Sequence, residues 1–470
     1  IICARPGPSG IIGVENCLVL NIFTKDVNTP KPVLVWLNGD EPVPSTSEQY
    51  SFRKFVEEEE LVVVTLNYRL SIFGFLCLKT PSAPGNAGLK DIILGLQWIQ
   101  RNIASFGGNP NNIVLMGHGS AAAMVELINL SPKSENLVHK AIALSGTAVA
   151  PWAVSYDPIG SALVLINAMD RTIYTLDDIV LILTSSTINL NQVSNLLNEF
   201  NYTNNTQLFA PCIEDVSFED AILTDAPRNI LKSGKYGHIP YLAGYVTREG
   251  TQRAKQALFD GWLEKMQDNF TDFLPADLKI RDNKESISQD IRQFYFNGSP
   301  ININSIESYL HYHGDTMVVV PTIRGALERA ATSAAAVRLF EFGYMGSLNS
   351  EWNYDQIPLN GVRHGGILNY IFDFDLRPED ANVTESIVKR ISTFIYTGNI
   401  NDTDSVPYLY YGGTFENVTH QEMATTNPQG HVMAFWDKLY LEYYHAPSSA
   451  NQLMGLLVVV LLSFILVRVF

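Results

Sequence analysis

Residues 117–121 of the chain read Gly-His-Gly-Ser-Ala, a run that resembles a Gly-x-Ser-x-Gly motif without its central serine. In that motif the serine lies on a sharp turn between a strand and a helix, and the turn presents its hydroxyl for attack on a carbonyl carbon. Here the central residue is Gly119, which has no side chain and cannot act as a nucleophile. We therefore expect a turn with the shape for nucleophilic catalysis that lacks the group to perform it.

The segments around this turn have the pattern that it requires. Residues 113–116 form a short apolar run, as expected for a strand buried on both faces, and residues 122–130 have the character of a helix. Two further apolar runs, 33–37 and 61–66, precede them, and a helix is predicted over 89–100 from its apolar spacing. Strand, helix and strand in this order predict a parallel sheet with crossover helices.

Later segments extend the predicted sheet. Strands are predicted over 140–145, 241–245 and 337–342. Residues 155–235 are less regular, and we expect them to form helical structure that caps the sheet. No linker divides the chain, so we predict one domain over residues 1–445.

The composition excludes several classes of function. A formal net charge of −16 repels phosphate backbones, so nucleic acid is not an expected partner. The 4 cysteines include no Cys-x-x-Cys pair, which gives no support to a zinc site or a thioredoxin-like redox centre. We therefore predict no metal and no cofactor.

Glycosylation sequons indicate the secretory pathway. Seven Asn-x-Ser/Thr triplets occur, mostly among polar, loop-like residues. Their asparagines are Asn201, Asn204, Asn269, Asn297, Asn382, Asn401 and Asn417. In that oxidising compartment we expect a disulfide between Cys3 and Cys17. A secretory chain needs a signal peptide and none begins this sequence, so we expect that it was removed or that the sequence is a fragment.

The C-terminal residues predict attachment to a membrane. Residues 446–453 form a polar spacer, and residues 454–470 are almost entirely apolar. As a helix these 17 residues would span about 26 Å, which is marginal for a hydrocarbon core of about 30 Å. Small residues at 448–450 precede the run, as in a GPI-attachment signal, whereas Arg468 does not fit that signal. A GPI anchor and a single transmembrane segment therefore both remain open.

Several different short motifs occur along most of the chain. They are Glu15-Asn16-Cys17-Leu18-Val19-Leu20-Asn21-Ile22-Phe23, Asn67-Tyr68-Arg69-Leu70, Gly74-Phe75-Leu76, Pro84-Gly85-Asn86-Ala87-Gly88-Leu89-Lys90-Asp91, Phe106-Gly107-Gly108-Asn109-Pro110-Asn111, Leu144-Ser145-Gly146, Thr397-Gly398-Asn399 and Phe435-Trp436-Asp437. In this order and spacing they resemble the type-B carboxylesterase and cholinesterase family, which includes catalytically inactive adhesion proteins. The resemblance implies an α/β-hydrolase fold, with a large, mostly parallel mixed sheet flanked by helices. It also implies that several dozen residues before Cys3 are missing here.

The resemblance implies a catalytic triad with one member lost. The family's nucleophilic serine corresponds to Gly119, because the flanking motifs match without a gap. The acid and the base correspond to Glu249, in an Arg-Glu-Gly run, and to His364, in a Val-Arg-His-Gly run. Without a nucleophile, these two are expected to persist as a buried, hydrogen-bonded pair. Ser120 is the alternative nucleophile, but one helical step turns its side chain about 100° away from the base.

Two further departures from the family pattern affect the site and the core. Where the family has a His-Gly-Gly-Gly oxyanion hole, this chain has Gly39, Asp40 and Glu41 after an asparagine. A carboxylate there would oppose a developing oxyanion, which a single donor stabilises by about 3–4 kcal/mol; alternatively, the loop faces solvent and forms no hole. The family also pairs a buried arginine, here Arg69, with an aspartate that is replaced by Asn109, so we expect that pairing to be lost or replaced.

These observations predict a catalytically inactive relative of the carboxylesterases and cholinesterases. We expect a glycoprotein of the secretory pathway, held at the cell surface through its C-terminus, that acts by binding or adhesion to an extracellular protein. The binding role follows from family analogy alone. The alternative is an active carboxylic ester hydrolase that transfers the acyl group of a small-molecule ester through a serine such as Ser120. A truncated gene product that folds poorly is a third hypothesis.

Overall fold

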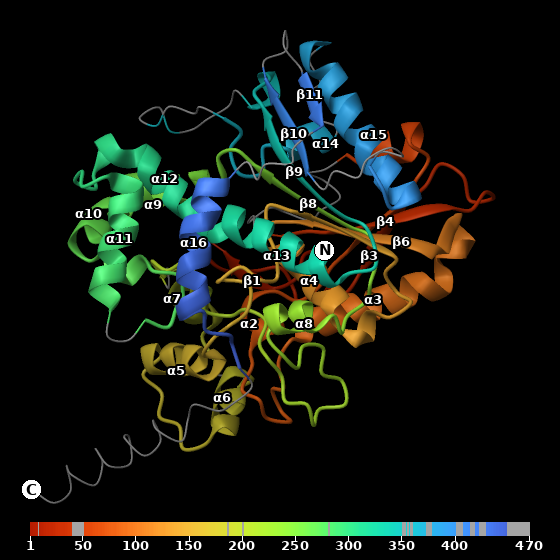
Figure 1. Ribbon diagram of the computed structural model, residues 1–470. Coiled ribbons are helices and arrows are strands. Elements are labelled where there is room, and N and C mark those ends of the chain that lie inside the picture. The colour runs from red at the N-terminus through yellow and green to blue at the C-terminus, as the bar shows by residue number, and fades with distance from the viewer. Residues whose placement is uncertain are drawn as a thin grey trace, which may run out of the picture.

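A mixed sheet runs through the computed structural model of the chain, with helices on both of its faces (Figure 1). The structure describes residues 1–7, 9–39, 51–185, 188–199, 202–280, 283–349, 354, 357, 361–372, 378–400, 408–413, 419–422 and 429–448. Within these residues, nine strands form the large sheet, and two short strands form a separate antiparallel pair. The strands of this pair are β1 (Arg5–Gly7) and β2 (Gly10–Ile12).

The large sheet is parallel except at its two edges. In chain order its strands are β3 (Leu20–Phe23), β4 (Lys31–Leu37), β5 (Val62–Leu66), β6 (Gly108–His118), β7 (Lys140–Leu144), β8 (Tyr241–Val246), β9 (Val337–Tyr344), β10 (Tyr408–Gly413) and β11 (Thr419–Glu422). In space their order is β11-β10-β9-β8-β7-β6-β4-β5-β3. Only β3 with β5 and β10 with β11 pair antiparallel.

The central strands have apolar side chains on both faces, which explains their continuous hydrophobic runs. In β4, Val33, Val35 and Leu37 pack into one core, and Leu34 and Trp36 pack into the other. All five of these residues are at most 1% exposed. Each such side chain contributes about 1.5–3 kcal/mol when it is fully buried, so the sheet is a rigid platform for the loops at the carboxyl ends of its strands.

Two groups of helices cover the two faces of the sheet (Figure 1). The first group includes α3 (Ala87–Asn102), α4 (Ser120–Leu130), α13 (Val320–Thr332) and α16 (Gly430–Tyr443). The second includes the π-helix η1 (Lys54–Glu58), α14 (Leu368–Ile371) and α15 (Ala381–Thr397). The other α-helices are α2 (Ser71–Phe75), α5 (Pro158–Ala168), α6 (Leu176–Leu183), α7 (Leu190–Glu199), α8 (Pro227–Ser233), α9 (Ala254–Phe259), α10 (Trp262–Asp268), α11 (Lys284–Phe296) and α12 (Ile306–Gly314).

The predicted fold class is confirmed: the sheet is large, mixed and mostly parallel, and helices flank it. All six predicted strands are present, as β4 to β9, and the region 155–235 contains the helices α5 to α8. The strands β3, β10 and β11 were not predicted. Two of them, β3 and β11, are the edge strands of the sheet. Edge strands contribute to one ladder only and need no continuous apolar run, so their sequences carry a weaker signal.

Two disulfides are formed, and one of them was predicted. Cys3 is bonded to Cys17, as expected. Cys77 is bonded to Cys212, 135 residues away, and no cysteine among the described residues is free. Closing a loop of this length stabilises the folded chain by about 4–5 kcal/mol in the chain-entropy account. The second pairing has no sequence signal, because only the packing of the helices brings the two cysteines together.

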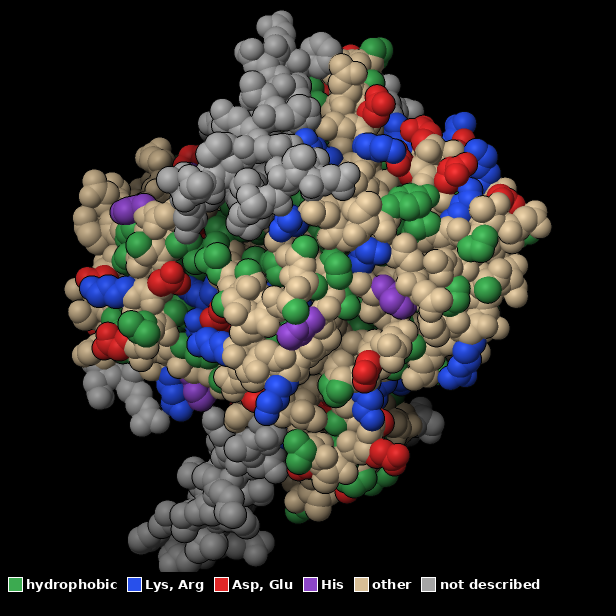
Figure 2. All heavy atoms as spheres, turned by 45° about the vertical axis from the view of Figure 1, so that its right-hand side comes forward, with side chains coloured by type: hydrophobic (Ala, Val, Ile, Leu, Met, Phe, Trp, Pro, Cys, Tyr) green, Lys and Arg blue, Asp and Glu red, His purple; other side chains and the backbone are tan. Residues whose placement is uncertain are grey.

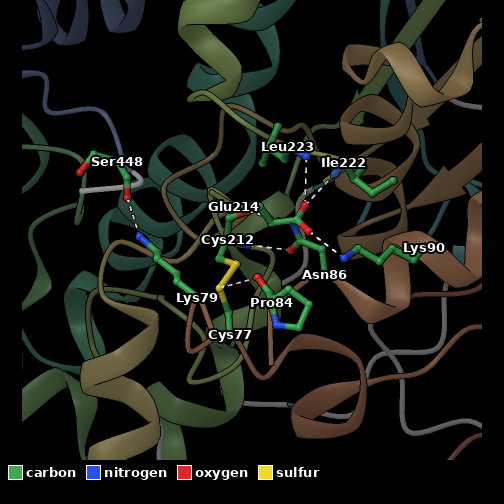
Figure 3. Close-up of a disulfide and its surroundings, with 10 residues drawn as sticks. All are labelled: Cys77, Lys79, Pro84, Asn86, Lys90, Cys212, Glu214, Ile222, Leu223 and Ser448. Atoms are coloured by element: carbon green, nitrogen blue, oxygen red, sulfur yellow. Dashed lines mark hydrogen bonds and ion pairs between the residues drawn. A yellow bond between two sulfur atoms is a disulfide. The ribbon is translucent and has the colours of Figure 1, made fainter. Parts of the chain in front are cut away.

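Around this second disulfide, Asn86 joins the loops that carry the two cysteines (Figure 3). Its amide Nδ2 donates to Cys212 O at 2.9 Å and to Glu214 Oε2 at 2.7 Å, and its Oδ1 accepts from Cys212 N at 2.9 Å. Lys90 Nζ lies 3.0 Å from Glu214 Oε1. A Cβ added at Gly85, whose φ is +107°, would lie 2.5 Å from Cys212 Sγ. The Pro-Gly-Asn motif at 84–86 therefore serves this junction and not the catalytic site.

The expected change in the partner of Arg69 is also visible. Its guanidinium binds Asp91 with two bonds, Nε to Oδ2 at 2.8 Å and Nη2 to Oδ1 at 2.7 Å. Asn109 instead accepts a hydrogen bond from Asn111 N. Arg69 is not buried as the family pattern implied, because its side chain is 39% exposed. The partner of Arg69 is therefore Asp91, and residue 109 takes no part in the pair.

Several predicted features lie outside the described residues. These are Asn201, Asn401 and Asn417, and also Asp40, Glu41 and residues 454–470. No described helix is both long and apolar enough to cross a membrane. The apolar C-terminal anchor therefore stays a prediction. Of the other sequon asparagines, Asn269, Asn297 and Asn382 are exposed and Asn204 is half-buried. Figure 2 shows one face of the molecule, on which the described acidic and basic side chains are interspersed.

Candidate active site

The turn that should carry a nucleophile is present and has the backbone conformation of one. It joins β6 directly to α4, and Gly119 lies at the junction with φ 59° and ψ −122°. For a residue other than glycine, such a conformation costs about 1–3 kcal/mol of strain energy. The strand before it ends at the carboxyl edge of the central sheet, where ligands bind in open α/β sheets. The predicted turn is therefore confirmed, and its central residue has no side chain.

Close backbone packing holds this turn. A Cβ added at Gly146 would lie 2.1 Å from Gly119 O, and one added at Gly117 would lie 2.7 Å from Ala121 C. Gly119 N also donates to Leu144 O of the neighbouring strand at 2.8 Å. The shape of the turn thus depends on backbone contacts and on glycines around it. It does not depend on a side chain at position 119.

Glu249 and His364, predicted from two distant motifs, meet in the structure. His364 Nδ1 lies 2.5 Å from Glu249 Oε2, and the other carboxylate oxygen accepts from Val246 N at 2.8 Å. The Glu249 side chain is fully buried, and that of His364 is 10% exposed. Thr251 Oγ1 accepts from His364 N at 2.9 Å, which fixes the backbone beside the ring. The acid and the base are therefore paired as in a triad.

A short parallel bridge brings the two loops together. Arg248 N donates to Val362 O at 2.9 Å, and Val362 N donates to Thr247 Oγ1 at 2.8 Å. The Arg248 side chain is buried and forms an ion pair with Glu307, and its Nη1 lies 2.9 Å from His311 Nε2. Burial, and then the charge of Arg248, lower the pKa of His311. These contacts tie the dyad to α12 and orient it toward the turn.

Gln252 contacts the nitrogen of His364 that a nucleophile would use. It lies in the 3-10 helix η4 (Glu249–Arg253), and its Nε2 is 3.0 Å from His364 Nε2. Because a carboxylate only accepts, His364 Nδ1 carries the proton and Nε2 is the acceptor. The amide nitrogen of Gln252 therefore donates to the lone pair that would take the proton of a serine. Sequence reasoning missed this residue, which no motif marks.

A second histidine lies beside the base. The rings of His118, the last residue of β6, and His364 have centroids 4.7 Å apart. His118 is 7% exposed, and no described residue makes a hydrogen bond to its Nε2. Burial, and to a smaller extent the neighbouring His364, hold the pKa of His118 well below its usual value. This ring is therefore neutral at physiological pH. Its place directly before the nucleophile position could have marked it in the sequence.

Ser120 is the first residue of α4, and Gly119 is the N-cap of that helix. Its side chain is partly buried and has contacts of its own. It stands one helical step beyond the elbow, and one such step corresponds to about 100° around the helix axis. For Ser120 to act as the nucleophile, His364 would have to contact its hydroxyl from the other side of the turn. Ser120 therefore remains the less favoured nucleophile.

The oxyanion-hole loop begins against the elbow. A Cβ added at Gly39 would lie 2.6 Å from Ala121 N and 2.7 Å from His118 O, so the backbone of this loop touches the turn. Tyr68 Oη donates to Asn38 O at 2.6 Å and fixes the start of the loop. Asp40 and Glu41 follow outside the described residues, so their effect on an oxyanion stays a prediction. Among the described residues no group of three His, Cys, Asp or Glu side chains could hold a metal ion.

Comparisons with known proteins agree with this geometry. A profile of the carboxylesterase family matches residues 4–436. A carboxylic ester hydrolase of Bombus ignitus is 27% identical over 406 residues, which are 83% of this chain and 72% of that protein. Esterase P of Drosophila melanogaster is 33% identical over 317 residues, 64% of this chain and 57% of that protein.

A solved structure shares the fold. It is juvenile hormone esterase from Manduca sexta with OTFP covalently attached, and it matches with a TM-score of 0.81 at 22% sequence identity. The match covers 94% of this chain and 88% of that one. The sheet, the elbow, the Glu249–His364 pair and the profile match over most of the chain lead to one conclusion. The chain belongs to the carboxylesterase family.

Proposed function

We propose that this chain is a carboxylesterase-family protein of the secretory pathway that does not hydrolyse esters through a serine and acts by binding. One observation carries this proposal: Gly119 occupies the elbow, with φ 59° and ψ −122°, where the chemistry requires a nucleophilic side chain. An acid–base pair without a nucleophile can polarise a bound group but cannot form an acyl-enzyme.

The contact between Gln252 and His364 supports the same proposal. The lone pair of His364 Nε2 already accepts a hydrogen bond from an amide nitrogen 3.0 Å away. A general base that is engaged in this way must break that bond before it can take a proton, and geometry precedes pKa in the selection of a base. The dyad then serves to hold the buried carboxylate of Glu249 and not to activate a hydroxyl.

A serine-directed fluorophosphonate probe tests this proposal on the protein expressed in a eukaryotic secretory host. We expect no stoichiometric labelling, and peptide mass spectrometry would locate any adduct. The same preparation should not release p-nitrophenol from p-nitrophenyl acetate above the rate of a heat-denatured sample. Labelling at Ser120 with matching turnover would overturn the proposal.

The second candidate function is carboxylic ester hydrolysis. It is favoured by the names of the relatives, which include esterases and a carboxylic ester hydrolase, and by the intact Glu249–His364 bond. In this case a small-molecule ester would be the substrate and Ser120 the acyl acceptor. The variants Ser120→Ala and His364→Gln decide between the two candidates. Ester turnover that both variants abolish would establish the hydrolase, whereas turnover that neither changes is not produced at this site.

The place of action and the partner also belong to this proposal. We propose an extracellular protein as the binding partner and a C-terminal membrane attachment through residues 454–470. Release from cell membranes by a phosphatidylinositol-specific phospholipase indicates a GPI anchor. Retention after that treatment, with extraction by detergent alone, indicates a transmembrane segment. Secretion of the complete chain into the medium would contradict attachment of either kind.

A further inference from the structure

A cavity lies far from the elbow in the sequence, between the loop that follows α7 and the segment that leads into α11. Its volume is about 370 Å³, within the range of sites that hold small ligands. The lining is mixed, because aliphatic residues and residues with hydroxyl, amide, carboxylate and ammonium groups both contribute to it. The polar and aromatic residues that line it are Tyr202, Thr203, Asn204, Thr271, Asp272 and Lys284.

Asn204 in this lining is the acceptor residue of a sequon, and its amide is held in one orientation. Its Oδ1 accepts from Thr206 N at 3.2 Å and from Thr206 Oγ1 at 2.7 Å. These bonds fix the amide plane. They do not involve Nδ2, the atom that would carry a sugar. No described residue makes a hydrogen bond to that nitrogen. A substituent on Asn204 Nδ2 would therefore start at the wall of the cavity.

The backbone that carries Asn204 is anchored on both sides. Asn205 follows with a φ of +65° and is buried, where its Oδ1 accepts from Arg253 Nε at 2.7 Å and its Nδ2 lies 3.1 Å from His313 Nδ1. Thr203 Oγ1 donates to Asp272 O at 2.7 Å, and both residues line the cavity. The direction of a group attached to Asn204 is therefore set by the core and not by a mobile loop.

The neighbouring sequon at Asn269 differs in this respect. Its Nδ2 donates to Asp272 Oδ2 at 2.8 Å, and its Oδ1 accepts from Thr271 Oγ1 at 2.6 Å. This amide is exposed and already bonded to its own turn. It does not line the cavity, so the sequons at Asn204 and Asn269 are not equivalent.

We infer that the cavity seats the first N-acetylglucosamine of an N-linked glycan on Asn204, so that the sugar links the 202–206 loop to residues 271–280. Sugar rings are bound by aromatic faces together with hydroxyl, amide and carboxylate groups, and this lining offers all of them. The inference rests on the secretory location proposed above. In the transfer, sugar C1 bonds to Asn204 Nδ2, its bond to the diphosphate of a lipid-linked oligosaccharide breaks, and the amide loses one proton.

Glycopeptide mass spectrometry on the protein from a eukaryotic secretory host is the first test. We expect occupancy at Asn204, and we expect peptide N-glycosidase under native conditions to release this glycan about tenfold more slowly than the one on Asn382. A seated core sugar is released only when the site opens locally. Asn382 is the matched control because it is exposed at the start of α15. Equal release rates at the two sites would overturn the inference.

Stability provides the second test. We expect Asn204→Gln to lower the Tm by about 2 °C, whereas Asn382→Gln changes it by less than that. Trimming with an endoglycosidase that leaves one N-acetylglucosamine should preserve the Tm, since the seated sugar remains. An unoccupied Asn204 among occupied sequons would overturn the cavity inference alone. Sequons that are all unoccupied would instead contradict the secretory location on which the proposed function depends.

Discussion

The two halves of the candidate active site are held by different kinds of contact. The elbow is held by backbone: Gly146 packs against Gly119 O, and Gly119 N donates to the neighbouring strand. The dyad is held by side chains, with His364 on one carboxylate oxygen of Glu249 and a backbone amide on the other. A backbone-held turn keeps its shape when its side chain is lost. A side-chain pair persists because removal of one member leaves the other buried and unsatisfied.

This difference teaches how to interpret a partial triad. An intact acid–base pair is also a stability element, since each orphaned buried polar group costs about 1–3 kcal/mol. The Glu249–His364 pair is therefore evidence of family membership and of packing, and not in itself of turnover. The elbow is the half that decides the chemistry, because a nucleophilic side chain at its central position is what attacks the ester, and position 119 is a glycine. Four predictions test this division.

Replacement of Glu249 by Ala should have the largest effect. It leaves His364 Nδ1–H and Val246 N–H buried without an acceptor, at about 1–3 kcal/mol each. Urea unfolding at neutral pH measures the loss. Glu58→Ala, on an exposed carboxylate, is the control. If both variants lost the same small amount, the pair would not be a stability element and the comparison would fail.

Gly119→Ala should lower the free energy of unfolding by about 1–3 kcal/mol, because a residue with a Cβ is strained at φ 59° and ψ −122°. Thermal or urea unfolding is the measurement, with Ser120→Ala at the helix start as the control. A stability gain of about 0.4–1 kcal/mol, the usual result where alanine fits without strain, would show that the elbow is not held by its backbone.

Gly119→Ser alone should react slowly with a fluorophosphonate, because Gln252 occupies His364 Nε2. The double variant Gly119→Ser/Gln252→Ala should react about tenfold faster or more, since a positioned general base contributes about 10²–10⁴-fold. Equal rates for the two variants would place the block elsewhere, with Asp40 and Glu41 as the next residues to replace.

The smallest expected effect concerns pH and His118. Burial, first, and His364 lower its pKa in the folded state, so its neutral form favours folding. This contribution is complete above the unfolded pKa of about 6.5 and is lost below it, by about 1.4 kcal/mol per pH unit. Below pH 6.5 the free energy of unfolding of the unmutated chain should fall with this additional slope. In the His118→Gln variant that part of the fall should be absent. Unfolding at several pH values checks it, with the exposed His238→Gln as the control. An unchanged slope would contradict the burial argument.

Much of the fold was predictable because its signals are local. The runs at 33–37 and 113–116 are continuous and apolar, and both form central strands buried on both faces. The edge strand β3 was missed because half-exposed strands need no such run. In the site, Gly119, Glu249 and His364 followed from motifs. Gln252 belongs to no motif, and the role of His118, which lies within the elbow motif, became visible only through its contact with His364.

By itself the sequence determined that the nucleophile position is a glycine and that this glycine sits between a strand and a helix. These properties depend on residue types and on conformations over a few residues. Only the tertiary structure decided which distant groups meet: His364 with Glu249 and Gln252, Cys77 with Cys212, and Asn204 with the wall of a cavity. Such contacts depend on how helices and loops pack around the sheet, over separations of tens to hundreds of residues, and no local pattern encodes that packing.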